Sequence, residues 1–400
     1  MKRTSRMLLI LLAVLAMMAA ACGSDDEAEA GGSEGTEAPG GTEAPSEGGE
    51  GASDAKAAFI MVAPIGDAGW NFMHNEGRLG AEEATGVETA YVDSIPEGSA
   101  EFDNAVQQFI DDGYNIIITT SFNYMDATEQ FATDNPDVVF EHISGFKMND
   151  TNFGNTFGRM YQPRYIAGMA AAAASETNRI GYVAAFAIPE VIRGINAFTL
   201  GAQAVNPDIE VEVVWTSTWF DPGVEGNAAQ ALIDNGADVL TMHQDSTATG
   251  EVATEAGATF IGYHSDMSAQ VDAYLTAPVW DFTPRYTEIL SSAAAGNFTP
   301  ESFWGGIADG IVDIAIPDGS PVAAEMKEVR ESIINGEFDV FEGEIIAQDG
   351  SAITDADGNL VVDLQDSFGN DIGAVGDALN DGILLGMSFF VEGVIGSAEG

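Results

Sequence analysis

Aromatic and acidic side chains recur together at points where the sequence predicts that a strand ends and a helix begins. Six such groups follow one another: Asp67 and Trp70; Phe122 and Tyr124; Trp219, Phe220 and Asp221; His243 and Asp245; Tyr263, His264 and Asp266; and Trp280 and Asp281. Indole rings that flank a slot suit a flat heterocycle, while carboxylates accept hydrogen bonds from ring N–H groups, amines or sugar hydroxyls. Any single group could be core or surface, but six at successive strand ends predict a binding site for a flat ligand.

The stretch 63–80, APIGDAGWNFMHNEGRLG, shows how one of these groups is positioned. It follows an apolar run at 57–62 that predicts a strand, and it leads into a helix that Asp67 or Asn71 can cap. A Gly-rich loop between a strand and a helix presents side chains at the carboxyl edge of a parallel sheet, where open α/β folds bind ligands. We therefore expect Asp67 to be a polar anchor beside the stacking ring of Trp70.

Patterns for catalysis or metal binding are missing from the sequence. It contains no Gly-x-Ser-x-Gly elbow, no Walker loop and no His/Cys cluster, and its four histidines lack the spacing of metal ligands. His74 and His264 fall at or after strand ends, which favours a role as hydrogen-bond partners. We expect no catalytic residue, no metal and no cofactor.

Short apolar runs alternate with helical stretches through most of the chain. Strands are predicted near 57–62, 87–92, 114–120 and 137–144, and a second series begins at 179–185 after a helix rich in small residues. Repeated β-α units predict parallel, doubly wound sheets, hence an α/β fold with two lobes and a hinged cleft between them. The predicted lobe 1 comprises 56–146 with about 270–300, and lobe 2 comprises about 147–269 with 301–400.

The N-terminal region predicts export and lipid attachment. Residues 1–21 have a basic start and an apolar stretch too short for a comfortable membrane span of about 20 residues, followed by small residues before Cys22, the only cysteine. This arrangement resembles a bacterial lipobox and predicts lipidation of Cys22; the alternative is an ordinary signal peptide with an incidental cysteine. Residues 22–55 are rich in Gly, Ser, Glu and Pro and predict a disordered tether.

The charge is strongly negative, with 64 acidic and 13 basic residues. Nucleic-acid binding is disfavoured, because phosphate contacts need Lys and Arg. Cation binding is an alternative reading, but the acidity is better explained by a solvated surface, where salt screens the repulsion.

At this point the chain resembles a known family. The motifs GDAGWN, TSFNYMD, ISGFK, RIGYVAAFAIPEVIRGINAF, WFDPG, IGYHSDMS and FWGGIADG are similar in order to those of the basic membrane protein (PnrA-like) family. The resemblance implies a substrate-binding lipoprotein of an ABC importer with a type I periplasmic-binding fold. Its members bind purine nucleosides, and some bind free bases such as adenine.

Carried over by position, the resemblance implies several ligand contacts. Asp67 matches the family's early Asp, and because Asn75 stands where nucleoside binders place a ring, the stacking role is expected of Trp70 with His74. Trp219 matches the second stacking ring, and Asp266 matches one of two acids. His264 replaces the other acid, and Trp280 replaces a Lys.

These replacements suggest a smaller, more aromatic site that favours a free purine base over a nucleoside. The expected ligand-binding residues are Asp67, Trp70, His74, Phe122, Tyr124, Trp219, Asp245, His264, Asp266 and Trp280. We expect a monomer, lipid-anchored at the extracytoplasmic face of the cell membrane, that delivers its ligand to an ABC permease. The alternatives are a ligand-sensing lipoprotein of the same fold and, less favoured, a nucleoside-processing enzyme.

Overall fold

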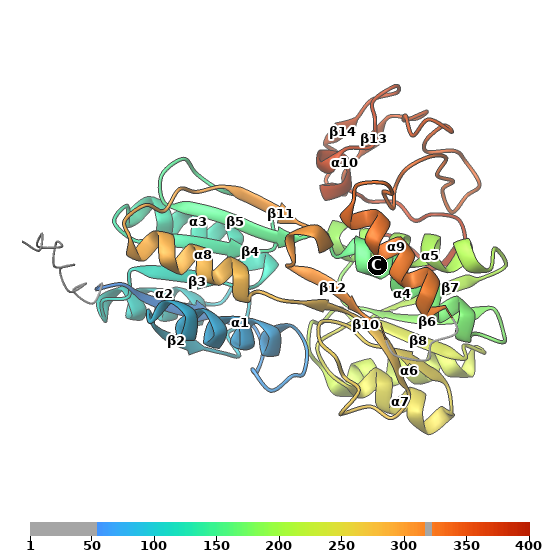
Figure 1. Cartoon of the computed structure of the whole chain (residues 1–400), viewed down its shortest axis with the longest axis horizontal. Helices are drawn as coiled ribbons and strands as arrows, with labels where there is room; N and C mark the ends of the chain where they lie inside the picture. The colour runs from blue at the N-terminus through green and yellow to red at the C-terminus, as the bar shows by residue number, and fades with distance from the viewer. Residues whose placement is uncertain (1–53, 317–321) are drawn as a thin grey trace, which may run out of the picture. The chain divides into compact units, whose positions relative to one another are not determined.

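Two mainly parallel β-sheets form the framework of the protein (Figure 1). The computed structural model describes residues 54–316 and 322–400. The predicted signal peptide, Cys22 and all but the end of the predicted tether lie outside the described residues. None of the helices within the described ranges has the length and apolar character needed to cross a membrane.

The first sheet is built entirely from parallel strands in the order β11-β5-β4-β3-β1-β2. Its strands are β1 (Lys56–Ile60), β2 (Glu88–Val92), β3 (Ile116–Thr119), β4 (Val139–Ile143), β5 (Phe153–Gly158) and β11 (Ser302–Gly305). Its helices are α1 (Trp70–Thr85), α2 (Ala100–Asp111), α3 (Met125–Asp134) and α8 (Thr283–Ala294), with a 3-10 turn, η1 (Phe122–Tyr124).

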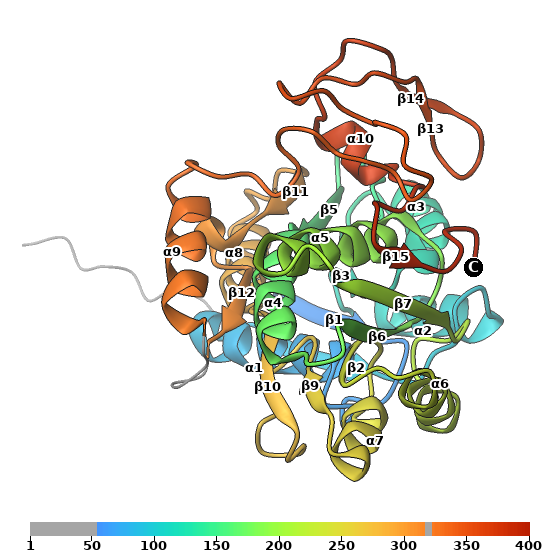
Figure 2. The same ribbon diagram turned by 90° about the vertical axis from the view of Figure 1, so that its right-hand side faces the viewer.

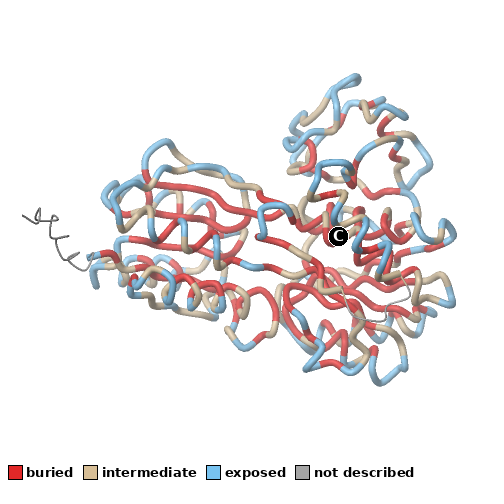
Figure 3. Tube along the Cα trace, in the orientation of Figure 1, coloured by how far each residue is buried: buried red, intermediate tan, exposed pale blue. Residues whose placement is uncertain are grey.

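Side chains alternate between the two faces of this sheet, as the period of a strand requires. On β1, Ala58 and Ile60 join one apolar cluster with Phe102 and Val106 of α2, whereas Phe59 joins another. Consecutive residues of the inner strands are buried, so both faces are covered, and Figure 3 shows these strands as mostly buried. This explains why their sequences read as near-continuous apolar runs.

The second sheet has the order β12-β10-β9-β8-β6-β7-β15, and all its pairings are parallel except that of β12 with β10. Its strands are β6 (Arg179–Ala184), β7 (Glu210–Trp215), β8 (Val239–His243), β9 (Thr259–Ile261), β10 (Tyr274–Trp280), β12 (Val312–Ala315) and β15 (Val394–Ile395). The accompanying helices are α4 (Tyr161–Ala174), α5 (Pro189–Val205), α6 (Pro222–Asp234), α7 (Ala248–Ala256), α9 (Ala323–Ile334) and the 3-10 turn η2 (Ile307–Asp309).

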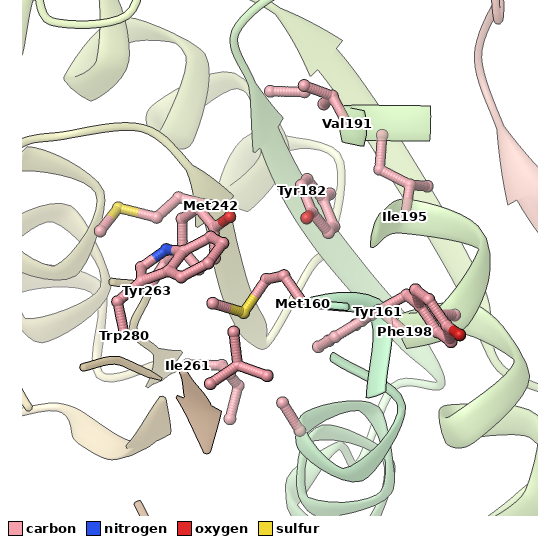
Figure 4. Packing of buried hydrophobic residues seen from close by; sticks show 14 of the residues in the cluster. Met160, Tyr161, Tyr182, Val191, Ile195, Phe198, Met242, Ile261, Tyr263 and Trp280 are labelled. Carbon is pink, nitrogen blue, oxygen red and sulfur yellow. The ribbon is translucent and has the colours of Figure 1, made fainter. Parts of the chain in front are cut away.

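Helices α4 and α5 pack closely against each other beside the second sheet (Figure 2). A side chain at Gly168 would overlap the carbonyl of Phe198, and one at Gly201 would overlap that of Tyr165. The small residues of α4 and α5 therefore permit the close approach of the two helices. Figure 4 shows that Met160, at the start of α4, belongs to the same buried cluster as Tyr263 and Trp280.

The chain crosses between the sheets three times, after β5, after β10 and after β11. Three strand assignments therefore differ from the predicted lobes. β5 and β11 belong to the first sheet, and β10 belongs to the second, although α8 packs on α1 as expected. The two sheets are alike in pattern, so an apolar strand does not indicate from its sequence which sheet it joins.

The segment after α9, residues 335–393, is mostly irregular. It contains β13 (Leu364–Gln365), β14 (Asp371–Gly373) and α10 (Asp381–Leu385), together with isolated antiparallel bridges. The sequence DADGN at 355–359 predicts a turn, and the structure has one there, in which Asp355 N–H donates to the carbonyl of Asn359. The apolar sequence over 379–393 predicts a closing helix, but helical structure in this stretch is limited to α10.

Candidate ligand-binding site

A cavity lies where strand ends of the two sheets meet. Its empty space measures about 380 Å³, a figure that includes solvent at its open side. It is lined by Val62, Trp70, Ser121, Phe122, Ser144, Phe157, Glu190, Trp219, His243, Asp245, Tyr263 and His264. We call this the inner pocket. Its walls follow β1, β3, β4, β8 and β9 of the two sheets, the carboxyl edges at which α/β folds place ligands.

Trp70 is held rigidly at one wall of the inner pocket. Its Nε1–H donates to the carbonyl of Thr120 at 2.6 Å, and its ring meets the edges or faces of His74, Trp280 and Phe282. The side chain is only 9% exposed. Trp70 therefore contributes both to the core and to the pocket wall.

Trp219 faces the pocket from the second lobe and is less enclosed. Its Nε1–H donates to Glu97 Oε2 at 3.2 Å, and its ring lies 4.9 Å from that of Phe186. The side chain is half-buried. Together with Phe122, Phe157 and Tyr263 of the pocket lining, the two indoles give a largely aromatic cavity.

The polar end of the pocket consists of Asp245, His264 and His243. Trp280 Nε1–H donates to His264 Nδ1 at 3.2 Å, so the proton of the neutral ring lies on Nε2, which faces Asp245 Oδ1 at 3.0 Å. Burial lowers the pKa of His264 well below its ordinary value and raises the pKa of Asp245 to about 8. At neutral pH this end is therefore mainly uncharged.

His243 has capacity to bind a further group. Its side chain is 5% exposed, and its Nδ1 has no hydrogen-bond partner among the described residues. Burial lowers its pKa well below the ordinary value. An unpaired polar atom in a buried site is costly, so a ligand that hydrogen-bonds this nitrogen would remove that cost.

Glu190 supplies a second carboxyl group to the pocket lining. Ser144 Oγ donates to Glu190 Oε2 at 2.7 Å, joining the end of β4 to the start of α5. Burial raises the pKa of Glu190 to about 7. This carboxyl can accept from a ligand N–H when ionised and donate when protonated.

The two lobes contact each other directly around the pocket. The Asp245 carboxyl accepts from the backbone N–H of Trp70, and Ser265 Oγ donates to the carbonyl of Ala68 at 2.5 Å. A side chain on Gly69 would lie 2.9 Å from the backbone of Asp245. The loop before α1 therefore seats on the second lobe, and the cleft is closed.

Five of the residues predicted to bind ligand line the inner pocket: Trp70, Phe122, Trp219, Asp245 and His264. Their role in binding stays a prediction. The other five lie elsewhere. Asp67 accepts from the backbone N–H groups of Gly69, Asn71 and Phe72 at the start of α1, so it serves the helix end.

The remaining four have structural partners or face away from the pocket. Tyr286 hydrogen-bonds His74 Nδ1 at 2.5 Å, and Tyr124 donates to the carbonyl of Ile95. Trp280 lies behind His264, and Asp266 is exposed. These side chains are therefore not part of the pocket lining.

Sequence reasoning missed several lining residues. His243 and Tyr263 belong to the aromatic and acidic groups at strand ends, and only their neighbours had been selected. Ser121 and Ser144 end strand regions too, and a search for polar residues at such ends would have found them. Glu190 and Phe157 carry no comparable signal, because one opens a helix and the other lies within a strand.

No group of three or more potential metal ligands occurs within the described part of the chain.

The structure combines two doubly wound lobes, three crossings of the chain between them and an aromatic pocket between strand ends. These features define a ligand-binding protein of the two-lobed α/β class. Hinged lobes that close on a small molecule are the mechanical basis of such proteins.

Comparison with known proteins identifies the family. The family model for the ABC transporter substrate-binding protein PnrA-like (Bmp) matches residues 55–344, and the chain belongs to this family. A purine-binding protein of Brucella abortus is 39% identical over 85% of this chain and 92% of its own length. A putative ABC transporter glucose-binding protein of Haloferax volcanii is also 39% identical, over 72% of this chain and 74% of its own.

Solved structures support the fold. A solute-binding protein of an ABC transporter system from Aeropyrum pernix superposes with a TM-score of 0.63 at 17% identity, covering 71% of this chain and 92% of that one. A similar protein from Conexibacter woesei gives 0.59 at 20% identity, covering 71% and 98%. The predicted type I periplasmic-binding fold is thereby confirmed. The family and these relatives are binding proteins, in agreement with the expectation of a non-enzyme.

Proposed function

We propose that this substrate-binding protein captures a purine-type ligand in the inner pocket and delivers it to an ABC importer. The observation that carries the proposal is the pocket itself, in which five rings surround a mainly uncharged polar end. A flat purine can stack on these rings while its nitrogens meet His243, Asp245 and Glu190. The purine-binding relative supports the same ligand class.

A monosaccharide is the main competitor, because one relative is named as a putative glucose-binding protein. A sugar has a hydroxyl on nearly every ring carbon, and each needs a partner once it is buried. Several polar groups of the pocket are already engaged, since Ser121 Oγ donates to Glu97 and Ser144 Oγ to Glu190. The aromatic walls and committed hydroxyls favour the purine.

Among purines, a free base is favoured over a nucleoside. His264 stands at the position where the resemblance places an acid in nucleoside-binding members of the family, and its replacement removes a polar partner for a nucleoside. We further propose that the protein is a monomer attached to the membrane through a lipid on Cys22. The alternative function, a ligand sensor of the same fold, would bind the same ligand but report it to a different membrane partner.

The test is a calorimetric titration of ligand-free protein with adenine, guanine, adenosine, guanosine and glucose. Ligand-free protein is prepared by unfolding, dialysis and refolding, and the released material is identified by mass spectrometry. We expect at least one purine base to bind, more tightly than its nucleoside, while glucose does not. Binding of glucose alone would replace the purine proposal, and a nucleoside that binds at least as tightly as its base would reject the preference for bases.

A further inference from the structure

A second, larger hollow adjoins the inner pocket. It has about 1060 Å³ of empty space and shares Phe122, Phe157 and Glu190 with the inner pocket. Beyond these residues its walls include Phe146 from the first lobe and Phe368 from the irregular segment that follows α9. We call this hollow the outer groove. Because three residues line both spaces, the outer groove and the inner pocket are neighbours.

The walls of the outer groove are mainly apolar. Phe146 is 58% exposed and Phe368 is 84% exposed, an unusual degree for aromatic side chains. Ile372 of β14 and Leu385 of α10 add aliphatic side chains to the lining. Such rings gain contact area only when another group covers them.

The segment that carries Phe368 is fastened to the second lobe. Arg193 of α5 donates to the carbonyl of Leu384 at 2.6 Å, and Asn196 donates to that of Phe389 at 2.8 Å. Arg159, at the first crossing, pairs with Asp381 through two bonds of 2.8 and 2.6 Å. The groove is thus formed between an anchored wall on one lobe and Phe146 on the other.

Charge excludes an anionic occupant of the groove. Glu190 and Asp366 lie in its walls, and the whole chain carries a formal charge of −51. Arg193 is the basic side chain of the lining, and its Nη1 is committed to the carbonyl of Leu384. A phosphate would meet more negative than positive charge here, and a ribose would find few free partners among the rings.

The juxtaposition of these walls with the inner pocket points to a ligand larger than the purine ring. We propose that the outer groove binds an uncharged, apolar substituent of a purine whose ring occupies the inner pocket, with Phe146 and Phe368 as its contacts. This inference rests on the proposed purine binding and extends it to a class of substituted bases. It assigns a ligand-selecting role to the segment around Phe368, which lies outside the region matched by the family model.

The test compares adenine with N6-benzyladenine and N9-benzyladenine by calorimetric titration. We expect at least one benzyl compound to bind at least as tightly as adenine. Phe146→Ala and Phe368→Ala should each weaken that compound about threefold or more, the scale of a lost aromatic contact, and leave adenine unchanged. Both side chains are exposed, so neither change should disturb folding.

Val375→Ala is the matched control, because Val375 is 61% exposed in the same segment and does not line the groove. It should leave all affinities unchanged. If adenine binds but both benzyl compounds bind more weakly than adenine, the groove proposal fails and purine binding stands. The groove proposal also fails if neither Phe variant affects the benzyl compounds. If no purine binds, the proposed function fails as well.

Discussion

At the scale of residues, the two pocket tryptophans differ in how deeply they belong to the core. The ring of Trp70 packs against three other aromatic rings, those of His74, Trp280 and Phe282. Trp219 is half-buried, and its partners are the ring of Phe186 and the carboxyl group of Glu97. Truncation of a fully packed Trp costs about 3–5 kcal/mol of stability. Trp219 is therefore the cleaner probe of ligand stacking.

Replacing Trp219 by Ala should weaken purine binding by about 1–3 kcal/mol, the measured scale of base–aromatic stacking. Thermal unfolding should change little, whereas Trp70→Ala should lower both affinity and melting temperature. Trp215→Ala is the control, because this half-buried indole stacks on Phe390 outside the pocket. Unchanged purine affinity in Trp219→Ala would remove Trp219 from the site.

The fate of Asp67 shows what sequence reasoning can and cannot separate. An Asp after a strand end can turn toward a ligand or toward the first turn of the next helix, and both uses produce the same local pattern. The structure gives Asp67 three backbone N–H partners. Asp245 follows the same kind of strand end but lines the pocket, because the neighbouring strands place its loop opposite Trp70.

At the scale of elements, the loop between β1 and α1 joins the two lobes when the cleft is closed. Gly69 fits against the backbone of Asp245, whereas Gly66, three residues earlier, has open space around it. This difference arises because only the second half of the loop reaches the other lobe. Closure therefore depends on the small size of one residue.

Substituting Gly69 by Ala should hold the lobes apart, since the new methyl group would lie 2.9 Å from Asp245. We expect about tenfold weaker purine binding, on the order of 1.4 kcal/mol, and a larger radius of gyration by small-angle X-ray scattering. Gly66→Ala is the matched control and should leave both quantities unchanged. Equal affinity in the two variants would show that closure does not require this contact.

Helices and strands with a strong hydrophobic periodicity were predictable from the sequence, but their grouping into sheets was not. β1, α1 and β3 were expected within a few residues of their bounds, because alternation of buried faces and helix caps are local properties. The helix expected over 379–393 failed for a tertiary reason. Val391 pairs with Ala347 in a bridge, and Met387 and Phe390 are buried in non-helical conformations. Apolar spacing alone does not reveal such a partner.

At the scale of the whole molecule, buried acids make stability depend on pH. Burial raises the pKa of four acids that are at most 4% exposed: Asp67 to about 7, Glu141 to about 7, Glu225 to about 7 and Asp245 to about 8. In the unfolded chain these groups ionise near 4. Between about pH 4 and 7 the folded state therefore binds more protons than the unfolded state, and stability falls as pH rises.

We expect the free energy of unfolding to be higher at pH 5 than at pH 7. Each such acid contributes a slope of about 1.4 kcal/mol per pH unit within this window. The measurement is urea unfolding at pH 5, 6, 7 and 8 in constant salt. Glu225→Gln should flatten the slope, because it removes one titrating group while the amide oxygen can still accept from the hydroxyl of Ser246. Stability that rises from pH 5 to 7 would contradict this assignment.

The three crossings also determine when the lobes can form during synthesis. The first sheet begins at Lys56, but its outermost strand, β11, ends only at Gly305, and the second sheet is completed by β15 near the C-terminus. A nascent chain that stops before residue 302 leaves the edge of β5 unpaired, with its backbone groups available to other strands. Neither lobe can therefore mature as a separate N-terminal unit. The two sheets are therefore completed only after residues 302–305 and 394–395 have been made, and strand edges left unpaired until then favour association with other chains.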